Sequence, residues 1–553
     1  PDLSALTKGL AAEASVSFDN IGGMNETTNK EYRYMNSNAS ITSDGTLVTT
    51  PAIYGTDSET LGHTQPFERL MLRSDFQAKV DYNRTFGKHQ VGGALIYDMQ
   101  SVVKNGRNNS QKNQSVLVNA TYTYDNRYSL NAVFNRSGSA YLPDGDKYSN
   151  YPAVSAAWIV SNEAFMEKVT PINLFKIRAS YGLSGWDGNL SHELWRQSYG
   201  SGGAGYNFGV NAGGQSGGSE GDLPVIGLVA EKSQKATFGF DLAAFDNRLN
   251  ATVEGFYEKR SDILVSGANS TSGIIGITVG QVNEGIYKYK GVDASLSWND
   301  KIGDFHYGIG ASMSYLNTEV VNVNQAYQEY DYLYTKGNRI GQMYGLEAIG
   351  FFNSQQEINN SPQQTFSDVA PGDVKYKDQN GDNRIDEKDI VKMFGSSVPR
   401  FYFGFNLNFS YKRLELSADF QGMTGVTVSL LNSPLYSPLV SNGNISNTFL
   451  NEEISWTPEN KTNATMPRLT TQENLNNYRA SSLWYRDGSF LKLRNLLVAY
   501  TFPKSQTRFA DLKVFVQGTN LFSLDNIHFA DPEQLGIAYP STRSYWAGIK
   551  LNF

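Results

Sequence analysis

The sequence of 553 residues contains no cysteine. This absence excludes disulfide bonds, thiolate metal sites and cysteine nucleophiles. No run approaches the ~20 apolar residues that a membrane-spanning helix needs. Histidine is also scarce: there are five, and none has a metal-ligand spacing such as HExxH. Because a P-loop is absent too, we expect that the chain is not an enzyme.

The composition favours a membrane protein without membrane helices. Proline is sparse, 17 residues against 52 glycines, and the formal net charge of -7 disfavours a nucleic-acid partner. Aromatic residues are plentiful, with 33 Tyr and 30 Phe, and such rings suit membrane–water interfaces. The mean hydropathy is nevertheless only -0.42. An outer-membrane β-barrel reconciles these values, because residues facing lipid and residues facing the lumen alternate along each strand.

Apolar and polar residues alternate along many segments of the chain. At the C-terminus, Tyr545, Ala547, Ile549, Leu551 and Phe553 form one apolar face, which indicates a β-strand. The same period of two predicts about 16 strands, near residues 10–18, 70–82, 91–97, 116–124, 128–134, 151–160, 175–183, 236–244, 249–257, 292–298, 305–315, 401–411, 414–420, 490–501, 512–521 and 543–553. The fold class predicted is all-β.

The connections between these segments alternate in length. Short ones lie near residues 83–88, 125–127, 246–248, 299–304 and 412–413, whereas long ones lie near 99–114, 184–232, 262–285, 318–398 and 422–488. This asymmetry is typical of a transmembrane antiparallel outer-membrane β-barrel with short periplasmic turns and long extracellular loops. Both chain ends then lie on the periplasmic side. A soluble all-β sandwich is the alternative, but it has no reason to sort its loops by length.

One long loop has the spacing of a calcium site. Residues 378–389 offer side-chain oxygens at positions 1, 3, 5, 9 and 12 of an EF-hand-like loop, namely Asp378, Asn380, Asp382, Asp386 and Asp389. The backbone carbonyl of Arg384 supplies position 7, and Ile385 anchors the loop in a core. We therefore predict a structural Ca²⁺ at these six residues.

The same loop departs from the EF-hand pattern at two positions. Asn383 replaces the usual glycine, although Asn tolerates the left-handed conformation. Asp389 replaces the usual glutamate and is one carbon shorter. The alternative is a solvated acidic loop that caps a short helix at residues 387–391.

Several motifs resemble the SusC/RagA family of TonB-dependent outer-membrane transporters of Bacteroidetes. They include PGDVKYKD at 371–378, VPRFYFGFNL at 398–407, FQG at 420–422, FGKH at 86–89, AAW at 156–158, KIRASYG at 176–182, FDNRL at 245–249, MPRL at 466–469, FLKLRNL at 490–496 and GTNLF at 518–522. The terminal Phe553 also matches. Each motif alone is weak, but together they cover most of the chain.

This resemblance implies a barrel of 22 strands, an N-terminal plug and a TonB-interacting segment. We expect residues 1–553 to be the C-terminal part of the barrel domain, with the plug and the TonB box outside this sequence and Pro1 not the start of the primary product. The implied function is active uptake of oligosaccharides or peptides. The implied partners are a SusD-like surface lipoprotein, TonB and the lipid bilayer, in a dimer of heterodimers in some members.

Two other functions stay open on the sequence alone: a passive porin, because 16 strands can close by themselves, and a structural or anchoring barrel in a larger complex. The substrate-binding residues are unknown. Aromatic residues in the loop at 185–221, such as Trp186 and Trp195, either stack on a substrate or pack the loop on itself.

Overall fold

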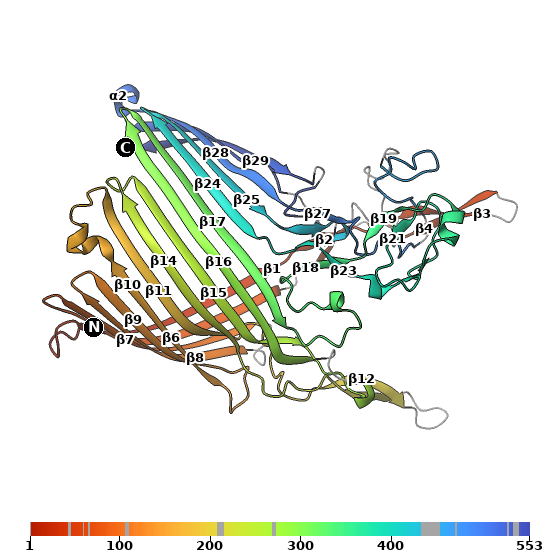
Figure 1. Cartoon of the computed structure of the whole chain (residues 1–553), viewed down its shortest axis with the longest axis horizontal. Coiled ribbons are helices and arrows are strands. Elements are labelled where there is room, and N and C mark those ends of the chain that lie inside the picture. The colour runs from red at the N-terminus through yellow and green to blue at the C-terminus, as the bar shows by residue number, and fades with distance from the viewer. Residues whose placement is uncertain are drawn as a thin grey trace.

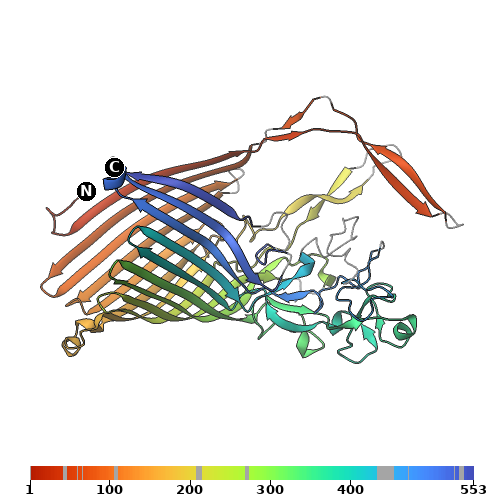
Figure 2. The ribbon, with the colours of Figure 1, turned by 90° about the horizontal axis from the view of Figure 1, so that it is seen from above.

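The computed structural model describes residues 2–41, 46–58, 60–64, 67–104, 110–206, 215–267, 273–432, 454–470, 473–527, 530–534 and 541–553. Parts of four predicted long loops, residues 105–109, 207–214, 268–272, 433–453 and 471–472, lie outside this description. One antiparallel sheet dominates the structure, and it curves into a deep trough (Figures 1 and 2).

The sheet contains 16 strands that follow one another in chain order. They are β1 (Leu10–Met24), β6 (Phe67–Phe86), β7 (His89–Lys104), β8 (Ser110–Tyr124), β9 (Tyr128–Ser139), β10 (Tyr148–Ile159), β11 (Ile172–Trp186), β14 (Glu231–Ala244), β15 (Leu249–Ser266), β16 (Gln281–Ile302), β17 (Phe305–Asn322), β24 (Phe401–Tyr411), β25 (Leu414–Thr424), β28 (Phe490–Phe502), β29 (Asp511–Asp525) and β30 (Ser544–Asn552). All 16 predicted strands are confirmed. Within the described residues, β1 and β30 form the two edges of the sheet and are not paired with each other.

Shorter elements fill the connections. The strands are β2 (Thr27–Asn29), β3 (Tyr34–Ile41), β4 (Leu47–Tyr54), β5 (Gly62–Thr64), β12 (Tyr199–Tyr206), β13 (Gln215–Glu220), β18 (Gln342–Gly345), β19 (Ala348–Phe351), β20 (Gln363–Gln364), β21 (Val374–Tyr376), β22 (Arg384–Ile385), β23 (Val391–Ser396), β26 (Thr427–Ser429) and β27 (Tyr485–Asp487). The helices are α1 (Gln355–Asn359), α2 (Lys504–Thr507) and the 3₁₀ turns η2 (Val160–Asn162), η3 (Ala164–Met166), η5 (Gly273–Ile275), η6 (Asp331–Leu333), η7 (Glu387–Asp389) and η8 (Leu430–Asn432). No helix in the described residues is long and apolar enough to cross a membrane.

The two ends of the sheet differ as the loop lengths predict. Both chain termini, the tight turns and α2 lie at one end, and the loop-borne strands β2–β5, β12 and β18–β23 lie at the other (Figures 1 and 2). The predicted turns after β8 and β14 have left-handed residues, with φ of 51° at Asp125 and Asn126 and 57° at Asp246. Asp and Asn accept this conformation more readily than other residues with side chains. We call these the turn end and the loop end.

The two faces of the sheet differ in polarity and exposure. On β8 the apolar residues Val116, Val118, Tyr122 and Tyr124 are exposed, while the polar residues between them are half-buried. Side chains on the convex face of a curved sheet spread apart, and those on the concave face crowd together. The apolar set therefore faces outward and the polar set lines the trough.

Candidate functional site

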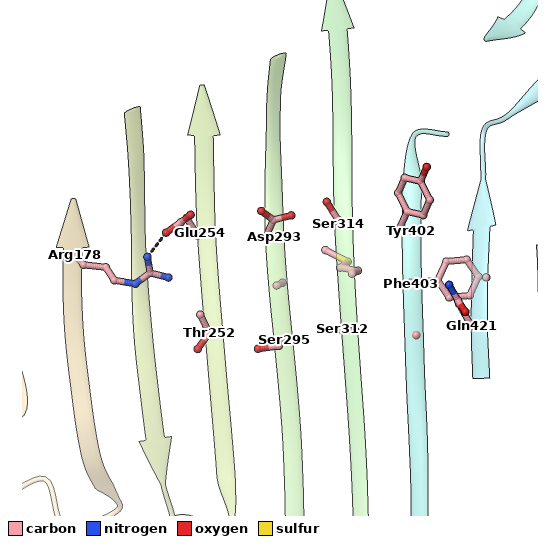
Figure 3. A pocket seen from close by; sticks show the side chains of 14 residues that line it. Arg178, Thr252, Glu254, Asp293, Ser295, Ser312, Ser314, Tyr402, Phe403 and Gln421 are labelled. Carbon is pink, nitrogen blue, oxygen red and sulfur yellow. Dashed lines mark hydrogen bonds and ion pairs between the residues drawn. The ribbon is translucent and has the colours of Figure 1, made fainter. Parts of the chain in front are cut away.

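Polar side chains form rows across the inner face of the sheet. In one row the strand registers place side by side five residues from β11, β15, β16, β17 and β24, which are Arg178, Glu254, Asp293, Ser314 and Tyr402. Figure 3 shows this row above a second one that contains Thr252, Ser295, Ser312 and Gln421. The residues of both rows occupy the polar positions of their strands, which the sequence predicts to face the lumen.

The side chains of these rows are mostly small, so the inner surface of the sheet is depressed there. The two rows line a depression of about 580 Å³, and a second depression of about 560 Å³ adjoins it toward the turn end. Ser295, Ser312 and Gly404 belong to both. Hydroxyl and amide groups that face a hollow can exchange hydrogen bonds with water or with polar solutes. The inner wall is therefore suited to a hydrated path.

Charged residues form ion pairs on the β11 side of this wall. Arg178 forms an ion pair with Glu254 across β14 (Figure 3), and its Nε lies 3.4 Å from Asp241 Oδ2. The Nζ of Lys176 lies 3.6 Å from the same carboxylate oxygen. Gly239 stands between Arg178 and Glu254 on β14. An added Cβ at Gly239 would lie 3.2 Å from the Cβ of Glu254. Because glycine has no side chain, it leaves room for the ion pair between Arg178 and Glu254.

The predicted calcium loop is a series of tight turns at the loop end. Asp378 accepts hydrogen bonds from the N–H groups of Gly381 and Asn383, at 2.6 and 2.8 Å. Asn380 accepts from Asp382 N–H at 3.1 Å, and Asp382 accepts from Arg384 N–H at 2.9 Å. The left-handed conformation expected of Asn383 is present, with φ of 61°.

The C-terminal half of this loop is anchored rather than open. Ile385 is fully buried in a core cluster with Leu346, Val374 and Tyr376, as predicted. Asp389 is also fully buried, and its two oxygens accept N–H groups of Gln379 and Asp386, at 2.7 and 2.9 Å.

Asp386 in turn caps η7, a 3₁₀ turn at the position where the alternative interpretation expected a short helix. In the described part of the chain, no three Asp, Glu or His side chains converge where a metal ion could sit. The calcium site therefore stays a prediction.

The two longest loops fold together around a buried carboxylate. Asp373 is fully buried and accepts hydrogen bonds from Arg468 Nε at 2.7 Å, Asn474 Nδ2 at 3.0 Å and Asn477 Nδ2 at 2.9 Å. Its partners come from a segment about 100 residues further along the chain. We call residues 340–398, 454–470 and 473–489 together the loop cap, because this network joins them.

Aromatic residues complete the core of the loop cap. Trp484 is fully buried, and its Nε1 donates to Asn477 O at 2.7 Å. Tyr376 donates its hydroxyl to Asn476 O at 2.7 Å. Burial raises the pKa of Tyr376, and it raises the pKa of Tyr478 to about 12. Both phenols therefore stay neutral hydrogen-bonding groups at physiological pH, and the cap is a folded unit rather than a loose loop.

A separate ion network ties the last loop to the sheet. Lys492 on β28 is buried, and its Nζ lies 2.5 Å from Asp531 Oδ1 and 2.6 Å from Glu533 Oε2. Arg494 lies 2.5 Å from the other oxygen of Glu533. Burial raises the pKa of each acid, but hydrogen bonds outweigh this effect and lower both pKa values: Asp531 accepts from Lys492, and Glu533 accepts from Arg494 and Lys492.

Two tryptophans near the loop after β11 differ in burial. Trp195 packs against a core cluster of Leu142, Leu190, Val225, Leu228 and Ala230, so it stabilises the loop itself. Trp186 is 54% exposed and is available for contact with another molecule.

Comparison with known proteins identifies relatives of the chain. No family model matches it. TonB-dependent receptor P26 of Formosa agariphila is 28% identical over 78% of this chain and 45% of its own length. TonB-dependent receptor P3 of the same organism is 26% identical over 85% of this chain and 51% of its own length. TonB-dependent receptor SusC of Bacteroides thetaiotaomicron is 22% identical over 78% and 43%. The chain thus spans about half the length of these curated relatives.

Solved structures agree in fold. The RagAB peptide transporter superposes with a TM-score of 0.71 at 18% identity, over 99% of this chain and 63% of that one. The RagAB peptide importer in its open-open state gives a TM-score of 0.70 at 17% identity, over 99% and 62%. At this identity the likeness concerns the fold of the sheet and its loops.

Proposed function

Because this chain is related to the SusC/RagA-type TonB-dependent receptors, we propose that it forms the C-terminal barrel part of an active outer-membrane importer. The resemblance, the barrel fold class and the outer-membrane location that the sequence predicts are confirmed by these relatives. The relatives are named as receptors, in keeping with the expectation that the chain is not an enzyme.

The observation that carries the proposal is the match along the whole sheet together with the folded loop cap. The match covers 99% of the chain in the RagAB structure, which is named a peptide transporter. Peptides are therefore the first substrate class to test, and oligosaccharides are the second. Large solutes need a wide polar path, and the hydroxyl-lined inner wall offers one between β11 and β25.

The proposed assembly contains partners beyond this chain. A SusD-like surface lipoprotein would cover the loop end, and TonB would act through a plug domain. The loop cap supports this arrangement, because its buried core holds two loops in one defined shape that a partner can recognise. The oligomeric state, including a dimer of such pairs, is part of the proposal.

A passive porin is the second candidate, since 16 strands can close alone. The two readings differ in energy dependence, because an importer needs TonB and a porin does not. Uptake of a fluorescent peptide mixture and of fluorescent oligosaccharides should be measured in cells that carry the complete protein, with and without TonB. We expect uptake of one class only when TonB is present. Uptake that persists without TonB overturns active import.

Calcium at residues 378–389 is also a proposal. Its support is the donor set, because Asp378, Asn380, Asp382 and Asp386 offer only oxygen ligands, which a hard cation prefers. Calorimetric titration of the purified protein with CaCl₂ should give saturable binding. The double variant Asp378→Asn/Asp382→Asn should weaken it at least tenfold, while Asp368→Asn, an exposed acid of the same cap, should not. Equal binding by all three proteins would exclude this site.

A further inference from the structure

A groove crosses the outer face of the sheet near its loop end. On the side of the turn end, the groove is bordered by a row of outward-facing side chains. The registers of five strand pairs align this row, which contains Val16, Phe76, Met99, Gln114 and Tyr148. The next outward row toward the loop end is small, with Ser74, Ser101 and Ala140, and contains Lys112. The cavity between the rows has a volume of about 570 Å³.

The groove lies at the depth of lipid headgroups. Gln114 is ten residues from Tyr124, the aromatic residue at the turn end of β8. At a rise of ~3.3 Å per residue and a tilt of ~45°, this separation is ~23 Å along the membrane normal. The apolar band of such a barrel is ~25 Å tall. The row of Gln114 and Tyr148 therefore stands at the outer membrane–water interface.

Two basic residues flank this row on the outer face. Lys112 lies two residues from Gln114 toward the loop end of β8. Arg136 of β9 pairs with Val116, which lies two residues from Gln114 toward the turn end. The Arg136 guanidinium lies 5.5 Å from the centre of the Tyr148 ring, and its Nη1 donates to Asn150 Oδ1 at 3.2 Å. The side chain thus turns upward toward the interface, as basic residues near a membrane surface do.

The neighbouring charges leave both groups available. Lys147 is engaged by Asp144, and Asp75 points to the inner face, where it binds Arg73 and Gln100. Asp146 is exposed in the turn above. Among the described residues, neither Lys112 nor Arg136 has a carboxylate within ion-pair distance. An exposed arginine on the lipid side is costly away from the interface, so an anionic partner would stabilise it.

We propose that this groove is a binding site for a phosphate-bearing lipid of the outer leaflet. The phosphate would lie between Lys112 and Arg136, which suits a guanidinium and an ammonium group. The headgroup would lie over Ser101 and Ala140, and the acyl chains would extend toward the turn end past the thioether of Met99 and the ring of Tyr148. Lipid is the occupant because the apolar outer face of an outer-membrane barrel is covered by lipid up to the interface at which this groove lies.

Lipid retention tests this assignment. The complete protein should be purified in mild detergent from outer membranes, and bound phosphorylated lipid should be counted per chain by mass spectrometry and phosphate assay. We expect at least one tightly held molecule in the wild-type protein. Lys112→Gln/Arg136→Gln should reduce retention at least threefold, and so should Ser101→Trp, which fills the groove without removing charge.

Matched controls separate this effect from misfolding. Lys112→Arg/Arg136→Lys keeps both charges and should retain the lipid. Lys301→Gln/Arg413→Gln removes the same charges from periplasmic turns and should also retain it. Equal retention by wild-type protein and Lys112→Gln/Arg136→Gln, or equal loss in the Lys301→Gln/Arg413→Gln control, overturns the proposal.

Discussion

At the scale of single residues, the carboxylate of Asp373 decides whether the loop cap holds together. Asp373→Ala removes the partner of Arg468 and of two buried amides, and loss of one member of a buried ion pair costs about 3–5 kcal/mol. We expect the cap to open and become sensitive to limited proteolysis, while the sheet stays folded. Asp368→Ala, at an exposed acid of the same cap, is the control. Unchanged proteolysis of Asp373→Ala would mean that other contacts fold the cap.

The ion network of Lys492 predicts a pH dependence. The pKa values of Asp531 and Glu533 are lowered in the folded protein. Their stabilising effect is therefore complete above the ordinary carboxyl pKa of about 4 and is lost as the pH falls below it. Hydrogen exchange of residues 530–534 should stay slow at neutral pH and accelerate at pH 3, after correction for the intrinsic rate. Lys492→Met should abolish this difference between the two pH values. If residues 530–534 of the wild-type protein exchange equally slowly at both pH values, the ion network does not order this segment.

Single-residue roles differ in how well the sequence predicts them. The spacing of Asp378, Asn380 and Asp382 is local, so the tight turn could be predicted. The bridge between Arg178 and Glu254 depends on the register of three strands, and residues 76 apart in the chain give no local signal. Alternation of Lys176 and Arg178 with apolar residues shows only that both face the lumen.

At the scale of elements, the strands were predictable because each one separates lipid from water. Lipid on one face and water on the other impose a period of two over the whole strand. The loop cap has no such period, since a network of buried Asn, Asp and Arg side chains orders it. Its short strands β18–β23 and the hairpins β2–β5 and β12–β13 were accordingly not predicted.

Glycines that accommodate a neighbouring ring give an element-scale prediction. A Cβ on Gly291 of β16 would lie 2.1 Å from Tyr315 O and 2.6 Å from Phe256 Cζ. Gly291→Ala should therefore displace the ring or the ladder and destabilise the sheet by about 1–3 kcal/mol. Gly255→Ala, on the neighbouring strand, meets no atom closer than 3.9 Å and should be tolerated. Urea unfolding in lipid vesicles compares the two, and equal stability would show that the sheet absorbs the added methyl group.

At the scale of the whole molecule, the 16 strands form one continuous wall whose two edges, β1 and β30, are unpaired within the described residues. The relatives are about twice as long as this chain. The outer face of this wall is apolar, as for contact with lipid, and its inner face is polar. The remaining strands, plug and lipoprotein stay part of the proposed assembly.

Spin labelling can distinguish the lipid-facing residues of this wall from the lumen-facing ones. The chain has no cysteine, so single variants Asp293→Cys, Ala294→Cys, Ser295→Cys and Leu296→Cys of the complete protein can be labelled without background. Collisions with oxygen, which dissolves in lipid, should be frequent at Ala294 and Leu296 and rare at Asp293 and Ser295. Equal oxygen accessibility at the four positions, or the reverse order, would contradict the account.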